Sequence, residues 1–269
     1  MKNLVVCFIV LSTVFVSCEK VIDIPLNEAD RQTVIEGVIN DRMGDNFIML
    51  SKSASVYTNS DYPKISGANV TVQDDEGVLY LFEEVDTAPG MYTCPTLIAE
   101  PETNYYLTVV TDGETYSART YAPQVAKIDS LTTLVQDFGI SEFLGYVPHT
   151  VYVHLTDDPT TENFYRFKIA INNEWSEFVY IGNDDFVNGE SFSAPFLGDL
   201  AREGDTVEVV MMGTDEAYYE FQYSLPSAQG GSGGFSVAPG NPITNIEGHN
   251  AVGYFAAFQT DTLKHFITE

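Results

Sequence analysis

Positive charge is scarce in this chain, in which 12 Lys and Arg residues stand against 39 Asp and Glu residues, for a formal net charge of −27. Nucleic-acid binding requires Lys and Arg to replace the counterions of the phosphates, so this composition argues against it. It also argues against electrostatic docking on anionic lipid. The acidity does not predict disorder, because hydrophobic residues make up 44% of the chain and aromatic residues 13%, enough to form a core.

Cysteine is also rare, with three in the whole sequence: Cys7, Cys18 and Cys94. The first two lie in or next to the apolar N-terminal segment, so the remainder of the chain holds one cysteine and can form no internal disulfide. Cys94 has no Cys-x-x-Cys partner, and we expect a buried structural thiol.

Long apolar runs are missing, and the longest, residues 4–16, is shorter than the ~20 residues of a membrane-spanning helix. It follows Lys2 and fits the core of a signal peptide. The run ends in Phe15-Val16-Ser17-Cys18, which resembles the lipobox of bacterial lipoproteins, where the chain is cut before a Cys that becomes acylated. We therefore expect a signal peptide over 1–17, lipid on Cys18 and a tether over 18–32. The alternative is an ordinary secretory cleavage site with an incidental cysteine.

The rest of the sequence is dominated by short alternating segments separated by turn residues. Residues 68–73 and 104–110 alternate apolar and polar side chains, and a tight-turn signal follows at 74–77. Strands spaced by about 8–12 residues are typical of a β-sandwich. We expect an all-β fold, with an immunoglobulin-like β-sandwich over 33–122 and a second β-rich, sandwich-like domain over 123–269. Residues 253–260 predict a closing strand of that second domain.

One segment, 214–225, has helical spacing. Tyr218, Phe221 and Leu225 fall on one face, and Thr214 is the expected N-cap. Residues 227–242 are rich in Gly, Pro and Ser and predict a loop. Within it, Gly230-Gly-Ser-Gly-Gly234 matches G-x-S-x-G, but a nucleophile elbow needs a strand before it and a helix after it, so we interpret it as a glycine loop.

Catalytic and zinc-binding patterns are missing. The four histidines form no i, i+4 pair on a helix and no H-E-x-x-H motif, and we expect a protein that is not an enzyme. Asp184, Asp185 and Glu190 are candidate calcium ligands in an acidic stretch. However, taking Asp184 as the first position of an EF-hand loop places Phe186 third, where an oxygen ligand is needed. An irregular calcium loop and a solvated acidic turn remain the two alternatives.

Trp175 is the single tryptophan of the chain and lies in the polar segment 172–177. An aromatic side chain in such a setting often contacts a ligand, for example by stacking on a sugar. Packing in the core or between domains is the alternative.

Several segments, in order, resemble a known family. They are Val34-Ile-Glu-Gly-Val-Ile, Ser66-Gly-Ala-Asn-Val-Thr-Val-Gln-Asp-Asp-Glu-Gly, Pro89-Gly-Met-Tyr, Asn163-Phe-Tyr-Arg-Phe and Gly253-Tyr-Phe-Ala-Ala. The family is the Bacteroidota outer-membrane lipoproteins catalogued as domain of unknown function 4249. The resemblance implies a lipid-anchored, β-rich cell-envelope protein, often encoded near TonB-dependent receptors. It implies no catalytic residues.

From these observations we expect a non-enzymatic accessory or ligand-binding lipoprotein of the outer membrane, with a TonB-dependent receptor barrel as the candidate partner. The first alternative is a calcium- or glycan-dependent surface adhesin, based on Trp175 and the acidic loops. The second is a hydrolase, which would need two carboxylates about 5–10 Å apart in a cleft.

Overall fold

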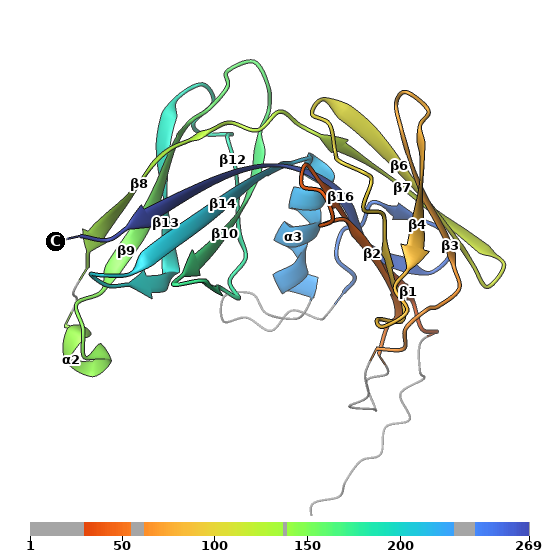
Figure 1. Ribbon diagram of the computed structural model, residues 1–269, viewed down its shortest axis with the longest axis horizontal. Helices are drawn as coiled ribbons and strands as arrows, with labels where there is room; N and C mark the ends of the chain where they lie inside the picture. Colours follow the sequence, from red (N-terminus) through yellow and green to blue (C-terminus); the bar gives the residue numbers. More distant parts are fainter. Residues whose placement is uncertain (1–29, 55–61, 137–138, 229–239, 269) are drawn as a thin grey trace, which may run out of the picture. The chain divides into compact units, whose positions relative to one another are not determined.

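The computed structural model describes residues 30–54, 62–136, 139–228 and 240–268, and its strands follow the alternation of apolar residues (Figure 1). The expected signal peptide, Cys18 and most of the expected tether lie outside the described residues, as does most of the expected glycine loop. The elements of the first half are β1 (Thr33–Asn40), β2 (Phe47–Lys52), β3 (Asn69–Asp74), β4 (Leu79–Glu84), β5 (Met91–Thr93), β6 (Thr103–Thr111), β7 (Glu114–Ala122) and β8 (Ile128–Val135). They are followed by α2 (Ser141–Leu144), β9 (His149–Thr156), β10 (Phe164–Ile171), β11 (Glu174–Trp175), β12 (Tyr180–Asn183), β13 (Ser191–Ala201), β14 (Thr206–Thr214), α3 (Glu216–Ala228), β15 (Ile246–Glu247) and β16 (Ala251–Phe266).

The strands form two sheets within the described ranges. One has 13 strands, ordered β11-β10-β14-β16-β1-β2-β5-β4-β3-β6-β7-β15, with β12 paired to β10. The other has three strands, ordered β13-β9-β8. The all-β, sandwich-like fold predicted from the sequence is confirmed. In the part of the chain that the structure describes, no helix is long and apolar enough to span a membrane.

The first core forms between strands of the first half and the C-terminal strands β15 and β16. Alternate residues of β3 and β6 are buried, as the sequence predicted, while their neighbours face outward. Each large apolar side chain removed from water here contributes roughly 1.5–3 kcal/mol. Cys94 is buried in this core as a free thiol, as expected. The buried members include Ile35, Ile48, Val70, Val72, Tyr105, Leu107, Val109, Phe255 and Ala257.

The second core lies between the three-stranded sheet and the strands β10, β14 and β16. Its buried members include Val151, Val153, Leu155, Tyr165, Phe167, Ile169, Phe196, Val207, Val209, Met211 and Ile267, with Leu263 packed against them. The residues 31–269 group as one compact unit. The division into an immunoglobulin-like domain over 33–122 and a second domain over 123–269 stays a prediction.

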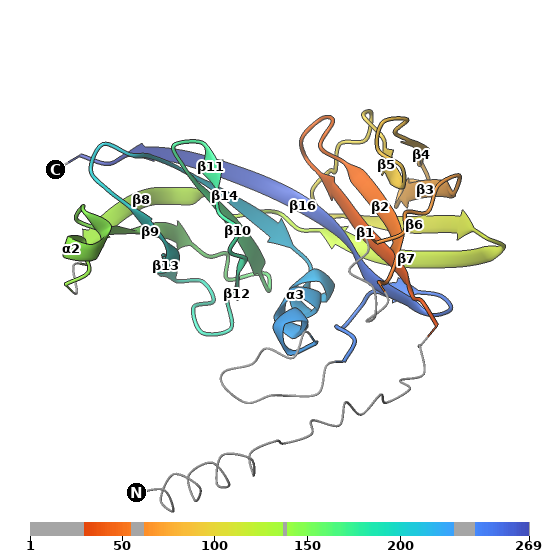
Figure 2. The same ribbon diagram turned by 90° about the horizontal axis from the view of Figure 1, so that it is seen from below.

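Strand β16 contributes to both cores, and Figures 1 and 2 show it running from β1 to β14. It pairs parallel with β1 and antiparallel with β14. Phe255 and Ala257 enter the first core and Leu263 packs against the second, so one face of a single strand contacts both; Ile267 of the second core follows directly after the strand. Gly253 permits the approach to β1, because an added Cβ would lie 1.9 Å from the carbonyl oxygen of Ile35.

Helix α3 confirms the helix predicted from the sequence, but the predicted cap is wrong. Asp215, not Thr214, caps it: the Asp215 Oδ1 accepts the backbone N–H of Tyr218 at 3.0 Å. The Thr214 hydroxyl is buried without a hydrogen-bond partner among the described residues. The cap lies one residue later than predicted because Thr214 is still the last residue of β14, and the helix begins only after Asp215.

Candidate functional site

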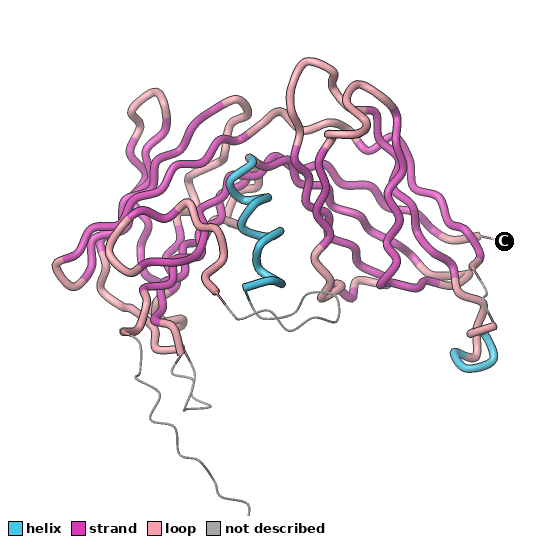
Figure 3. The backbone as a smooth tube through the Cα atoms, turned by 180° about the vertical axis from the view of Figure 1, so that it is seen from behind, coloured by secondary structure: helices cyan, strands magenta, loops and turns pink. Residues whose placement is uncertain are grey.

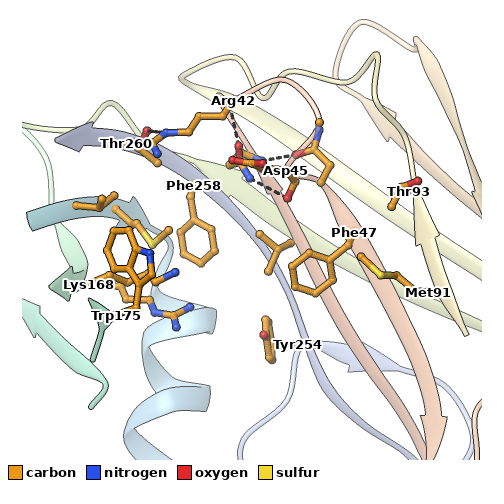
Figure 4. A pocket seen from close by; sticks show the side chains of 17 residues that line it. Arg42, Asp45, Phe47, Met91, Thr93, Lys168, Trp175, Tyr254, Phe258 and Thr260 are labelled. Carbon is orange, nitrogen blue, oxygen red and sulfur yellow. Dashed lines mark hydrogen bonds between the residues drawn. The ribbon is translucent and has the colours of Figure 1, made fainter. Parts of the chain in front are cut away.

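A pocket of about 600 Å³ lies on the large sheet, on the face turned away from both cores (Figure 4). Side chains alternate along a strand, so the residues between the core positions share this second face. On β10 these are Arg166 and Lys168, which alternate with the core residues Phe167 and Ile169. The other lining residues of β1, β2, β5, β14 and β16 are Val38, Asn40, Phe47, Met91, Thr93, Val210, Met212, Tyr254, Phe258 and Thr260.

Helix α3 lies beside this face of the sheet (Figure 3) and fixes two of the aromatic lining residues. The ring of Tyr218 packs edge-on against Phe258, with centroids 5.0 Å apart, and against Tyr254 at 5.2 Å. Tyr218 and Phe258 are fully buried. Desolvation raises the pKa of the Tyr254 phenol, so its hydroxyl stays protonated at physiological pH. The pocket therefore has a rigid, uncharged aromatic side.

Among the residues that the structure describes, three cations line the same pocket together with a single carboxylate, Asp45. Arg42 donates from Nη2 to Thr262 Oγ1 at 2.6 Å and from Nε to Thr260 Oγ1 at 3.2 Å. Arg166 donates from Nη1 to the Tyr218 hydroxyl at 2.6 Å.

Lys168 lies next to the indole of Trp175, with Nζ 4.8 Å from the ring centroid. Burial lowers the pKa of Lys168, and the positive charges of Arg166 and Arg42 lower it further. Within the described ranges, no carboxylate lies at ion-pair distance from Arg42, Arg166 or Lys168. The positive charge of the pocket is therefore not neutralised by salt bridges inside the described part of the molecule.

Trp175 lies on β11, opposite Ala170 of β10, and its side chain is 47% exposed. It lines the large pocket and also a smaller one of about 410 Å³, formed with residues such as Ile171, Asn172 and Asp199. The structure thus brings the candidate residue Trp175 together with two cations that sequence reasoning missed. A signal was present, since Arg166 and Lys168 alternate with apolar residues on one predicted strand. Contact of Trp175 with a ligand stays a prediction.

The candidate calcium ligands are not brought together as a coordinating group. The carboxylate of Asp184 is buried and accepts the backbone N–H of Asn163 at 2.9 Å. Asp185 is exposed and accepts a hydrogen bond from the Asn183 side-chain amide at 2.7 Å, and Glu190 is exposed directly before β13. Over the described ranges, no group of three or more His, Cys, Asp or Glu residues is placed to hold a metal ion.

Fold and pocket together define an acidic, all-β protein with a basic, aromatic-walled pocket on one face of its large sheet. The chain belongs to the family described as Domain of unknown function (DUF4249), whose model matches residues 19–264. The family expected from the ordered sequence segments is thereby confirmed. A comparison with proteins of curated function gave no match.

Proposed function

We propose that this protein is a non-enzymatic accessory lipoprotein of the cell envelope that captures a small ligand in the pocket on β10, β14, β16, β1 and β2. The observation that carries the proposal is the pocket itself. Its volume of about 600 Å³ lies within the range of small-molecule sites, which is roughly 300–1,000 Å³. Such sites combine an apolar lining with a few polar groups, and this one combines aromatic rings with unpaired cations.

The hydrolase alternative finds little support in this pocket. Its lining contains one carboxylate, Asp45, whereas a carboxylate-pair mechanism needs two. Bound ligand would therefore be held or passed on rather than cleaved.

The proposed location is the outer membrane, with lipid on Cys18 as the anchor and a TonB-dependent receptor barrel as the partner. The support is the sequence around Cys18 and the resemblance to envelope lipoproteins. In a bacterial host that processes lipoproteins, the wild-type chain should incorporate labelled palmitate and sediment with membranes, and Cys18→Ser should do neither. Equal membrane retention of both forms would refute the lipid anchor. Purification from native membranes without a co-purifying receptor would refute the partnership.

Ligand capture is tested separately, on full-length protein purified under mild conditions from its native envelope. Native mass spectrometry should detect a retained small molecule in the wild-type protein. Thr93→Phe, which places a ring in the pocket, should lose it, and Thr115→Phe, an equal change at an exposed position of β7, should retain it. Retention by both variants, or by no form of the protein, would contradict the proposed pocket.

A glycan-binding adhesin is the second candidate, because Trp175 is half-exposed between two pockets and its ring could stack on a sugar. A glycan array should then give a signal that Trp175→Ala removes. A blank array would leave only the small-ligand proposal.

A further inference from the structure

We propose that the pocket selects an amphipathic anion, a carboxylate or phosphate group attached to an apolar or aromatic body. The inference rests on the proposed function and specifies its ligand class. The anionic group would lie against Arg166 and Lys168, and the apolar body against the partly exposed rings of Tyr254 and Phe47.

The first argument is the distribution of charge. The whole chain has 12 Lys and Arg residues and 39 Asp and Glu residues, yet among the described residues three of the former and one of the latter line this pocket. Of the seven other described cations, three form salt bridges with carboxylates: Lys127 with Asp261, Arg202 with Asp205 and Lys264 with Glu208. The other four form none with a described carboxylate and do not line this pocket: Arg31, Lys52, Lys64 and Arg119. What distinguishes this site is that, among the described residues, three cations without a salt bridge line one cavity beside a single carboxylate, and such a cluster favours an external anion.

The second argument is an unsatisfied donor. Arg166 uses Nη1 to bind the Tyr218 hydroxyl, but its Nε is buried and has no hydrogen-bond partner among the described residues. A buried donor without an acceptor is costly, and native proteins usually satisfy such groups. The anionic oxygen of a ligand is the kind of acceptor that a guanidinium binds best.

The third argument is the apolar part of the same cavity. Figure 4 shows Phe47 on one side of the pocket, Lys168 beside Trp175 on the other, and Phe258 between them. Phe258 lies on β16, two strands from β10, which corresponds to roughly 10 Å at the spacing of neighbouring strands. The rings of Phe47 and Tyr254 are partly exposed, so an inorganic anion would leave them in water, whereas a ligand with an apolar body would cover them.

The test uses three probes with the same body and different charge: 4-phenylbutyrate, 4-phenylbutanol and 4-phenylbutylamine. Binding to the full-length protein is measured by calorimetry and by the emission of Trp175, the single tryptophan of the chain. We expect saturable binding of the carboxylate, binding of the alcohol weaker by about tenfold, and no binding of the amine.

The matched variants are Lys168→Met, Lys168→Arg and Lys127→Met. Lys168→Met should weaken binding of the carboxylate by about tenfold and leave that of the alcohol unchanged. Lys168→Arg keeps the positive charge and should bind the carboxylate as the wild type does. Lys127→Met removes the same charge from an exposed position and should also bind it like the wild type.

Equal affinity for the carboxylate and the alcohol would overturn the anion selectivity while leaving ligand capture intact. Failure of 4-phenylbutyrate to bind would also overturn the anion selectivity. Whether the pocket captures any ligand would then be decided by the mass-spectrometry experiment. An equal loss for Lys127→Met would overturn the anion selectivity as well, because the effect would then reflect net charge and not the pocket.

Discussion

Asp215 joins helix α3 to the sheet, and its replacement by Ala should destabilise the protein measurably. Its carboxylate accepts three hydrogen bonds: from the Tyr218 N–H at 3.0 Å, from the Tyr121 N–H at 3.0 Å and from the Thr120 hydroxyl at 2.8 Å. The Thr120 oxygen in turn accepts the N–H of Ala257 at 3.1 Å. One side chain thus links α3, β7 and, through Thr120, β16.

The expected cost of Asp215→Ala follows from these bonds. Loss of an N-cap costs about 1 kcal/mol, and the two other donors left without an acceptor add about 1 kcal/mol each. Burial of the charge opposes part of this, so we expect a decrease of about 2–3 kcal/mol in the free energy of unfolding. Urea denaturation followed by circular dichroism should show it as a lower midpoint with an unchanged slope.

The control is Glu216→Ala, which removes the same charge from the next, exposed residue and should cost less than about 1 kcal/mol. If Asp215→Ala unfolded within about 0.5 kcal/mol of that control, the role assigned to the three hydrogen bonds would be refuted.

Four further changes test other parts of the structure. Gly253→Ala places a Cβ 1.9 Å from the Ile35 carbonyl oxygen, so denaturation should show a loss of about 3 kcal/mol or more, and unchanged stability would contradict the pairing of β16 with β1. Tyr218→Phe removes the acceptor of Arg166 and should cost about 1–3 kcal/mol in the same assay; no loss would mean that this bond is not made. Binding of the anionic probe should weaken as pH rises towards the lowered pKa of Lys168, because the ammonium then deprotonates, and Lys168→Arg should bind with no such decline. Desolvation raises the pKa of the Asp215 carboxyl, so the folded protein holds the carboxyl proton more tightly than the unfolded chain does. The free energy of unfolding should therefore fall as pH rises through the raised pKa. Asp215→Asn should remove this pH dependence from urea midpoints measured across acidic pH.

Local features of the fold could be predicted from the sequence because they depend on neighbouring residues. The alternation in 68–73 and 104–110 predicted β3 and β6, and the spacing of Tyr218 and Phe221 predicted α3. The closing strand was predicted over 253–260 but extends over Ala251–Phe266, because its later residues gain partners on β14 that local pattern does not reveal. The parallel pairing of β16 with β1 was not predicted for the same reason, since alternation does not specify which distant strand will be the partner.

The candidate site was predictable only in part. Trp175 was singled out by its polar setting, and the structure places it at the pocket. Arg42 comes from the turn between β1 and β2, far along the chain from Lys168 on β10, and only the sheet order brings both to one cavity. The acidic residues around Asp184 were suggestive by composition alone, but a buried carboxylate that accepts hydrogen bonds from Asn163 already has a structural role.

The two faces of β16 connect stability with binding. Phe255, Ala257 and Leu263 face the cores, whereas Tyr254 and Phe258 line the pocket from the opposite face of the same strand. A ligand on the pocket face contacts the strand that both cores share, so its binding energy adds to the stability of both. A ligand at about 100 times its Kd should therefore raise the free energy of unfolding by about 2.7 kcal/mol and shift a single transition in the wild-type chain. If ligand shifted one of two separate transitions and left the other unchanged, β16 would not couple the two cores.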